Sequence, residues 1–263
     1  MNKKFRGIDI SLYQRNIDYD RVIKDNDFVI IKAGQGRTAE YNFPFTDPLF
    51  EQHIKAFRSR ISGKKFYIGV YWYFMGRTEA ETLEEVKYLI QILKPYKENI
   101  DIGVALDVED TSLMGDVDGL SRRVNLFLNS IIGAGYKAYI YANEYFLATQ
   151  FKNNLNFPLW LASIDDGTKS HKSLQKKYPN LKIWQYSFKG TEGGIYPVDC
   201  NEAVDIIGDT NTDYLVNMKD IVTLTRFLSG WNVKVNEVQS DINQDGYVNM
   251  KDLIELIRLM VEE

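Results

Sequence analysis

The sequence predicts an α/β protein: an irregular TIM-like (β/α) barrel followed by a small all-α calcium-binding module with two loop–helix repeats. Two observations predict the barrel. Short apolar segments alternate with amphipathic helical stretches, and several of these segments end in polar side chains. An internal repeat near the C-terminus predicts the module. We place the barrel at residues 1–205 and the module at 206–263.

The predicted strands are rich in β-branched and aromatic residues, as strands usually are. In order they read FRGIDIS, DFVIIKAG, KFYIGVYWYF, IGVALDVED, KAYIYAN, PLWLAS, KIWQYS and IYPVDCN. Helical periodicity separates some of them, most clearly over 79–94 and 121–134. Near-continuous apolar strands that alternate with helices are typical of parallel sheets covered on both faces. We therefore expect a parallel barrel.

Composition excludes several classes of function. The single cysteine, Cys200, cannot form an intramolecular disulfide, and two distant histidines provide no zinc site or histidine-based triad. From Asp209 onward the chain has ten acidic and five basic residues, whereas the rest of the chain is nearly neutral. This distribution argues against nucleic-acid binding and favours cation binding near the C-terminus. No apolar run is long enough to span a membrane.

Carboxylates follow three of the predicted strands. Asp107 and Glu109 in GVALDVED lie two positions apart, so an extended chain directs both to one face and Val108 to the other. Asp9 ends the first strand and Asp199 lies near the end of the last. Active sites of such barrels form at the carboxyl ends of the strands. We therefore expect these four carboxylates to share one mouth.

A carboxylate cluster with aromatic walls suits glycoside hydrolysis, in which one carboxylic acid protonates the leaving oxygen and another stabilises the cationic ring. Crowding raises at least one carboxyl pKa and keeps an acid protonated near neutral pH. A second metal site is the rival chemistry. Expected substrate contacts are Tyr71, Tyr73, Tyr141, Trp160, Trp184, Gln185 and Lys32. The aromatic residues could equally be core, and Lys32 a buried ion-pair partner of one of the acids.

The repeat has an offset of 32 residues: DTNTDYLVNMKD begins at Asp209 and DINQDGYVNMKD at Asp241, with eight of twelve positions identical. Asp at positions 1 and 5, Asn at 3 and 9 and a carboxylate at 12 match the spacing of calcium loops, in which position 7 contributes its carbonyl. The predicted ligands of two structural calcium ions are Asp209, Asn211, Asp213, Leu215, Asn217 and Asp220, and then Asp241, Asn243, Asp245, Tyr247, Asn249 and Asp252.

The two loops differ at position 6, where the turn is sharp. Gly246 occupies it in the second loop and Tyr214 in the first. Because tyrosine lacks the freedom of glycine at positive φ, we expect the first site to be weaker. The sequences before the loops, IIGD and VNEVQSD, do not look like entering helices, and position 12 is Asp rather than the Glu of ordinary EF-hands.

The body of the chain resembles the family 25 glycoside hydrolases through GIDIS, FVIIKAGQG, GVYWYF, ALDVED, YIYAN, LWLAS, WQYS and VDCN, over residues 5 to about 202. The resemblance implies a lysozyme (1,4-β-N-acetylmuramidase) that cleaves peptidoglycan without a catalytic cofactor. It also implies that Glu109 is the general acid, that Asp107 assists, and that Asp9 and Asp199 complete the acidic cleft. Two mechanisms remain open: assistance by the N-acetyl group of the substrate, which we favour, or attack by water.

One position departs from that family. The chain reads KAGQG after the second strand, where the family often has a KATEG-like sequence, so Gln35 replaces a glutamate. This removes a negative charge near the rim of the cleft. We expect it to affect substrate details more than catalysis.

The C-terminal repeat resembles the type I dockerin, a calcium-dependent module that binds a cohesin domain on a scaffoldin. By that resemblance, the cohesin-binding residues are Met218, Lys219, Met250 and Lys251. It implies an extracellular or secreted, scaffold- or cell-surface-associated protein, and we expect a signal peptide to be missing from this version of the chain. We also expect a monomer without nucleic-acid or membrane partners. The alternatives are a non-catalytic glycan-binding barrel, a glycosidase for chitin-like polymers, and a structural subunit with a vestigial barrel.

Overall fold

The structure is a computed structural model that describes residues 4–61, 66–152, 156–204, 208–211, 216–243 and 245–261. Its contacts divide the chain into two compact units. The larger unit is Phe5–Ala203, and the smaller comprises Val204–Glu263 together with the first four residues.

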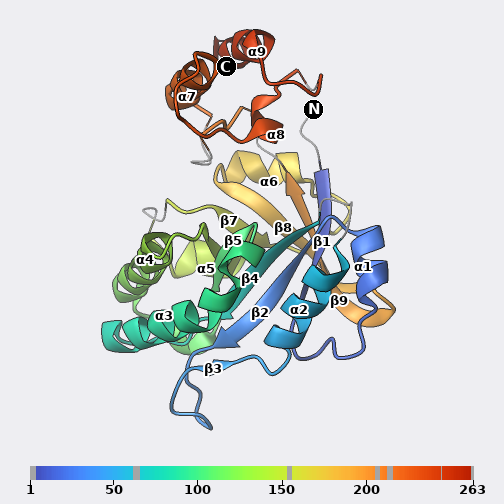
Figure 1. The fold of residues 1–263 in the computed structure, drawn as a ribbon. Helices are drawn as coiled ribbons and strands as arrows, with labels where there is room; N and C mark the ends of the chain where they lie inside the picture. Colours follow the sequence, from blue (N-terminus) through green and yellow to red (C-terminus); the bar gives the residue numbers. More distant parts are fainter. Residues whose placement is uncertain are drawn as a thin grey trace. The chain divides into compact units, whose positions relative to one another are not determined.

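The larger unit is a closed barrel. Within the described residues the strand order is β1-β9-β8-β7-β6-β5-β4-β2-β3, and β1 also pairs with β2, which closes the sheet (Figure 1). The short β3 pairs only with β2 and lies outside the closed ring. The strands are β1 Lys4–Ile10, β2 Phe28–Gln35, β3 Phe45–Thr46, β4 Tyr67–Tyr73, β5 Gly103–Asp107, β6 Ala138–Asn143, β7 Leu159–Ala162, β8 Leu181–Glu192 and β9 Ile195–Val204.

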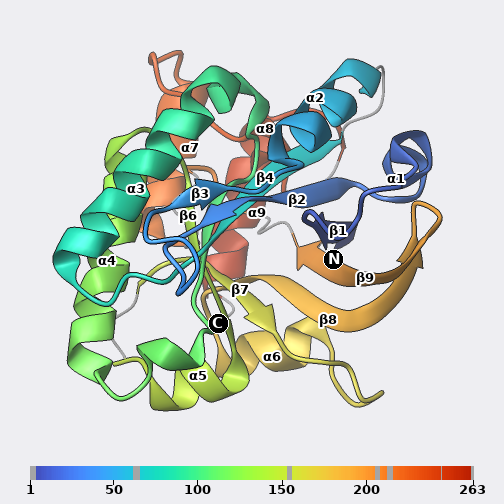
Figure 2. The ribbon, with the colours of Figure 1, turned by 90° about the horizontal axis from the view of Figure 1, so that it is seen from below.

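The predicted barrel is confirmed, but the expectation that all its strands are parallel is wrong. β8 and β9 form a long antiparallel hairpin, which Figure 2 shows as a curved ribbon pair on one side of the barrel. Gly193 and Gly194 form its turn with φ of 57° and 76°. Two successive residues at positive φ give the turn that suits the twist of a tight hairpin, and glycine adopts it without steric cost. The GG pair in the sequence was therefore the overlooked hairpin signal.

Helices cover the outside of the barrel, and the core lies between them and the apolar outer face of the sheet. α3 and α4 pack side by side (Figure 2). α4 starts four residues earlier than the sequence predicts, because the Asp116 side chain accepts a hydrogen bond from the Gly119 N–H and caps the first turn. The α-helices are α1 Tyr19–Asp25, α2 Phe50–Arg60, α3 Glu79–Leu93, α4 Val117–Gly133, α5 Glu144–Thr149 and α6 His171–Lys177; 3₁₀ helices span Lys94–Asn99 and Thr111–Leu113.

The smaller unit is helical. α7 (Met218–Leu228) and α9 (Met250–Val261) pack through Leu224, Leu253 and Leu256, and the four-residue α8 (Glu237–Ser240) precedes the second loop. The expectation that no helix precedes the second loop is therefore wrong, although α8 is only a single turn. Residues 205–207, which include the expected boundary between the two domains, lie outside the described residues. Among the described helices, none is both long and apolar enough to cross a membrane.

Candidate active site

The end of β5 separates polar from apolar side chains as the alternation predicts. Val108 is buried in the core between sheet and helices, whereas Asp107 and Glu109 lie on the opposite, inner face. Backbone hydrogen bonds hold this segment in place: the Phe74 N–H donates to the Asp107 carbonyl and the Val108 N–H to the Tyr141 carbonyl, both at 2.9 Å. Two carboxylates thus project from one strand end into the barrel mouth.

Asp9 is held by two amide side chains. Its Oδ2 accepts hydrogen bonds from Gln185 Nε2 and Asn201 Nδ2, each at 2.8 Å. The orientation of each amide is fixed in turn. Tyr141 Oη donates to Gln185 Oε1, and Trp160 Nε1 donates to Asn201 Oδ1, both at 2.8 Å. Because each amide oxygen is already an acceptor, its nitrogen faces Asp9, and any proton on Asp9 resides on Oδ1.

The sequence reasoning missed Asn201. It lies two positions after Asp199 on β9, so both side chains point to the same face of the strand. The same alternation that singled out Asp107 and Glu109 could have identified it. Gln185 was predicted as a substrate contact; in the structure it is buried and holds Asp9.

The four carboxyl groups influence one another. Burial first, and then the charge of Asp199, raises the pKa of Asp9 to about 7, although the amide hydrogen bonds oppose the shift. Burial raises the pKa of Asp199 to about 6. Burial and the charge of Asp199 raise the pKa of Glu109, and burial and the charge of Glu109 raise that of Asp107 well above its usual value. The cluster therefore retains protons near neutral pH, as an acid catalyst requires.

Lys32 lies beside this cluster. The pKa of Lys32 lies below its ordinary value because the side chain is buried, and the negative charges of Asp107, Asp47 and Glu109 oppose this shift only in part. Its Nζ donates to Gln35 Oε1 at 3.0 Å and lies 5.1 Å from the centroid of the Tyr73 ring. Gln35 thus contacts the lysine whose charge acts on Asp107 and Glu109. A neutral amide leaves the lysine charge available to the carboxylates.

The expected aromatic contacts occupy three different environments. Tyr71 and Tyr73 are half-buried on the inner face, and Tyr73 Oη donates to Asp110 at 3.0 Å. Tyr141 and Trp160 are buried within the barrel, Trp160 with 1% exposure, and their rings meet edge to face. The Tyr141 hydroxyl and the Trp160 N–H orient Gln185 and Asn201, so these two aromatic residues position the amides that bind Asp9.

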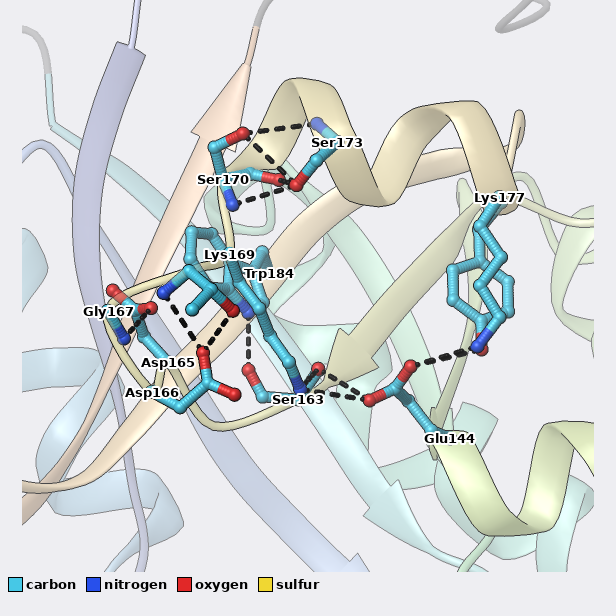
Figure 3. Close-up of polar contacts among 12 residues, drawn as sticks. Glu144, Ser163, Asp165, Asp166, Gly167, Lys169, Ser170, Ser173, Lys177 and Trp184 are labelled. Atoms are coloured by element: carbon cyan, nitrogen blue, oxygen red, sulfur yellow. Dashed lines mark hydrogen bonds and ion pairs between the residues drawn. The ribbon is translucent and has the colours of Figure 1, made fainter.

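Trp184 is on the wrong face for a substrate contact. Trp184 of β8 lies opposite Leu161 of β7, and both side chains belong to the core between the sheet and the helices. The next residue, Gln185, points to the inner face of the barrel. Trp184 Nε1 donates to the Ser163 carbonyl at 2.6 Å, a bond visible in Figure 3. The tryptophan therefore anchors the loop after β7. Of the two readings that the sequence left open for Trp184, substrate contact or core, the structure shows a core position.

A polar network fastens the ends of β6 and β7 (Figure 3). Glu144, at the start of α5, accepts hydrogen bonds from Ser163 Oγ and from Lys169 Nζ, and Lys177 Nζ binds its other oxygen at 3.2 Å. Burial alone would raise the pKa of Glu144, but these partners lower it to about 2. The carboxylate is thus a structural anion that holds the loop after β7, separate from the protonated cluster.

In the smaller unit the two loops have matching contacts. Asp220 accepts hydrogen bonds from the N–H groups of Asn211 and Asn217, and Asp252 accepts the corresponding pair from Asn243 and Asn249. Gly246 has a φ of 88°, as its position at the sharp turn required. The donor atoms are oxygens of carboxylates, amides and carbonyls, the hard ligands that calcium prefers. Asp213, Tyr214 and Leu215 lie outside the described residues.

Met218 and Met250 are the first residues of α7 and α9, with 63% and 59% exposure, and Lys219 and Lys251 follow them on the surface. The repeat therefore presents the same exposed pair at two equivalent helix starts.

A closed β/α barrel with a crowded carboxylate mouth defines a protein of the glycosidase class. The model of the glycosyl hydrolases family 25 matches residues 8–195, and that of the dockerin type I domain matches residues 207–260. The chain therefore belongs to glycosyl hydrolase family 25 and carries a type I dockerin domain.

The chain is also similar to individual proteins and solved structures. The protein YegX of Escherichia coli K12, described as uncharacterized, is 28% identical over 204 residues, covering 74% of this chain and 68% of YegX. The autolysin LytC of Streptococcus pneumoniae, solved with a synthetic peptidoglycan ligand, has a TM-score of 0.62 at 23% identity. The match covers 76% of this chain but only 46% of LytC. The spore cortex lytic enzyme SleM of Clostridium perfringens has a TM-score of 0.63 at 16% identity, covering 76% of this chain and 67% of SleM.

Proposed function

We propose that this protein is a peptidoglycan hydrolase, a 1,4-β-N-acetylmuramidase, attached through a calcium-loaded dockerin to a cohesin-bearing scaffold outside the cell. The observation that carries the catalytic part is the carboxylate mouth, in which Glu109 and Asp107 share one strand end and Asp9 is oriented by Gln185 and Asn201. The catalytic unit is residues 1–205 and the dockerin residues 206–263.

Glu109 is the general acid in this proposal. Its raised pKa keeps a proton available for the glycosidic oxygen, and its partial burial leaves it accessible to substrate. As the bond to the leaving sugar breaks, the carbonyl oxygen of the substrate's N-acetyl group attacks the anomeric carbon. Asp107, buried with an Oδ1 that has no hydrogen-bond partner among the described residues, accepts the N–H of that acetamido group. Water then opens the cyclic intermediate and returns a proton to Glu109.

Asp9 and Asp199 complete the cleft, and Tyr71, Tyr73 and Lys32 line its inner face. Lys32 stabilises the ionised forms of Asp107 and Glu109, since its charge lowers the pKa of both. In the competing mechanism Asp9 or Asp199 activates a water, and a trapped cyclic intermediate would distinguish the two.

The test of the catalytic proposal is mass spectrometry of purified peptidoglycan after incubation with the protein or with Glu109→Gln. Muropeptides that end in reducing N-acetylmuramic acid should appear with the parent protein only. Binding without cleavage by either protein would favour a glycan-binding barrel, and cleavage of chitin oligomers in preference to peptidoglycan would favour a chitin-type glycosidase.

For the dockerin, the exposed pairs at the starts of α7 and α9 support cohesin binding. The protein should bind a type I cohesin with calcium and lose that binding after chelation. Substitution of either pair alone by alanine should reduce affinity less than substitution of both, because each helix offers the same residues. Equal loss from one pair would show that a single face is used.

A further inference from the structure

A fifth carboxylate lies beside the four that form the mouth. Asp47 follows β3 and precedes α2, and the residue is only 3% exposed. Its N–H donates to the Ala33 carbonyl at 3.0 Å, so Asp47 lies next to β2, one position beyond Lys32. Its place in a loop, rather than at the end of a predicted strand, kept it out of the predicted site.

Both carboxylate oxygens of Asp47 are engaged by backbone donors. Oδ2 accepts a hydrogen bond from the Leu12 N–H at 3.0 Å, and Oδ1 accepts one from the Leu49 N–H at 2.9 Å. A backbone N–H can only donate, so two such donors suit a carboxylate anion. With both oxygens engaged in this way, Asp47 is suited to hold a charge rather than to exchange a proton with a substrate.

The bond to Leu12 fixes the chain shortly after Asp9. Leu12 lies in the loop that follows β1, and the carboxylate that holds its N–H is 35 positions away in the sequence. His53 of α2 supports the same loop, since its Nε2 lies 3.3 Å from the Ser11 carbonyl oxygen. Asp47 and α2 thus hold the backbone segment that continues from Asp9.

The charge of Asp47 also reaches the inner face of the barrel. Burial lowers the pKa of Lys32. The charges of Asp107, Asp47 and Glu109 oppose that shift. Burial raises the pKa of Tyr71 well above its usual value, and the charge of Asp47 is among those that add to the shift. Two inner-face groups therefore have Asp47 as an electrostatic neighbour.

The three charges that act on Lys32 differ in their part in the reaction. In the proposed mechanism Glu109 gives its proton to the glycosidic oxygen and later regains one. Asp107 belongs to the cluster that retains protons near neutral pH. Asp47 has no step in that mechanism, and both its oxygens accept backbone hydrogen bonds. Its negative charge can therefore remain beside Lys32 throughout the catalytic cycle.

We propose that Asp47 is a positioning residue of the active site. It keeps a fixed negative charge beside Lys32, so that the lysine stays positively charged near Asp107 and Glu109, and it anchors the loop that continues from Asp9. This assignment rests on the proposed hydrolase function, because it gives Asp47 a part in that same site.

The test is the titration of Lys32 in the parent protein and in Asp47→Asn, followed through the NMR signal of the lysine Cε. Asparagine has nearly the same shape and keeps one oxygen acceptor, but it carries no charge. The titration midpoint of Lys32 should fall by about one pH unit, the size expected when a nearby opposite charge is lost from a buried site. The alkaline limb of kcat/KM on peptidoglycan should move to lower pH in parallel, because an uncharged Lys32 no longer stabilises ionised Asp107.

Asp27→Asn is the matched control. Asp27 immediately precedes β2, at the end of the strand away from Lys32, and its Oδ2 accepts a hydrogen bond from the Arg6 N–H of β1 at 2.9 Å. This variant should leave both the Lys32 midpoint and the alkaline limb unchanged. Asp47→Ser is a second test variant, which offers the Leu49 N–H a hydroxyl acceptor without a charge, and it should lower the Lys32 midpoint as Asp47→Asn does.

An unchanged Lys32 midpoint in folded Asp47→Asn and Asp47→Ser would overturn the assignment. A loss of kcat/KM that is equal at all pH values would also overturn it, because it would indicate a purely structural role for the bonds to Leu12 and Leu49. The Lys32 titration does not depend on turnover. If the midpoint falls as expected but the parent protein cleaves no peptidoglycan, the hydrolase function is wrong and the electrostatic role of Asp47 stands.

Discussion

Replacing Asp9 by asparagine should make the stability of the barrel less sensitive to a rise in pH from about 4 to 7. The folded pKa of Asp9 is about 7 and its ordinary value is 3.8, so folding favours the protonated carboxyl. The corresponding stabilisation is present below pH 3.8 and is lost as the pH rises through 7. Asparagine has nearly the same shape, and its oxygen can still accept from Gln185 and Asn201.

The magnitude follows from the two pKa values. Because its pKa is higher in the fold than in the unfolded chain, Asp9 lowers the free energy of unfolding by about 2 kcal/mol at pH 5 and by about 4 kcal/mol at pH 8, compared with its contribution well below pH 3.8. Asp9→Asn removes this cost at both pH values. The gain in the free energy of unfolding of the variant over the parent should therefore be about 2–3 kcal/mol larger at pH 8 than at pH 5, so the variant is relatively more stable at pH 8.

The assay is urea unfolding at the two pH values, followed by tryptophan fluorescence, because Trp72, Trp160 and Trp184 are buried in the barrel. Asp25→Asn, which alters an exposed carboxylate on α1, is the control and should give the same difference at both pH values to within ~0.5 kcal/mol. A relative stability of Asp9→Asn that did not change between pH 5 and 8 would show that Asp9 ionises with an ordinary pKa in the fold. The reasoning about burial and neighbouring charge would then fail.

Three other perturbations have defined outcomes. Asn201→Leu removes one hydrogen-bond donor from Asp9 and should raise the pKa of Asp9 by about one unit, because a hydrogen bond to a charged group is worth ~1.5–3 kcal/mol. NMR titration of the Asp9 carboxyl carbon checks this. An unchanged titration midpoint would contradict the role of Asn201 in stabilising the Asp9 carboxylate. The ionised Glu144 should stabilise the parent above pH 4.5, and this stabilisation is lost as the pH falls towards 2. Glu144→Gln should remove this pH-dependent contribution, which is worth ~1 kcal/mol or less at this partly exposed site. Thermal unfolding at pH 6 and pH 3 measures it, and equal acid sensitivity of both proteins would argue against the network. Gly246→Ala should weaken calcium binding about fivefold to thirtyfold because an L residue at this positive φ costs ~1–2 kcal/mol. Gly230→Ala, also at positive φ but outside the loops, should leave the calcium titration unchanged, and equal effects would indicate a general loss of folding.

Local patterns in the sequence predicted most of this arrangement. Strand alternation placed Asp107 and Glu109 on one face and Val108 on the other, and the twin loops were visible as a repeat of 32 residues. These features depend on neighbours in the chain, so they can be read without knowing the fold.

The contacts that organise the site depend on distant segments. Gln185 and Asn201 reach Asp9 across separations of 176 and 192 residues, and only the closure of the barrel brings them together. The role of Trp160 as a donor to Asn201 likewise requires the β7, β8 and β9 registers. The sequence identified Gln185 and Trp160 as candidates but missed Asn201, and it could not distinguish a group that touches substrate from one that orients a carboxylate.

The reversed direction of β9 also determines where the catalytic unit begins and ends. β1 starts at the end of the barrel away from Asp9, and β9, running against β8, returns the chain to that same end, where Ala203 pairs with Ile183 near the start of β8. The rim that carries the carboxylates is therefore built from internal loops and contains no chain terminus. Partners can be fused to either end of this unit without threading a linker through its catalytic rim. Such a unit is suited to exchange between differently assembled proteins, and to engineering by simple end-to-end fusion.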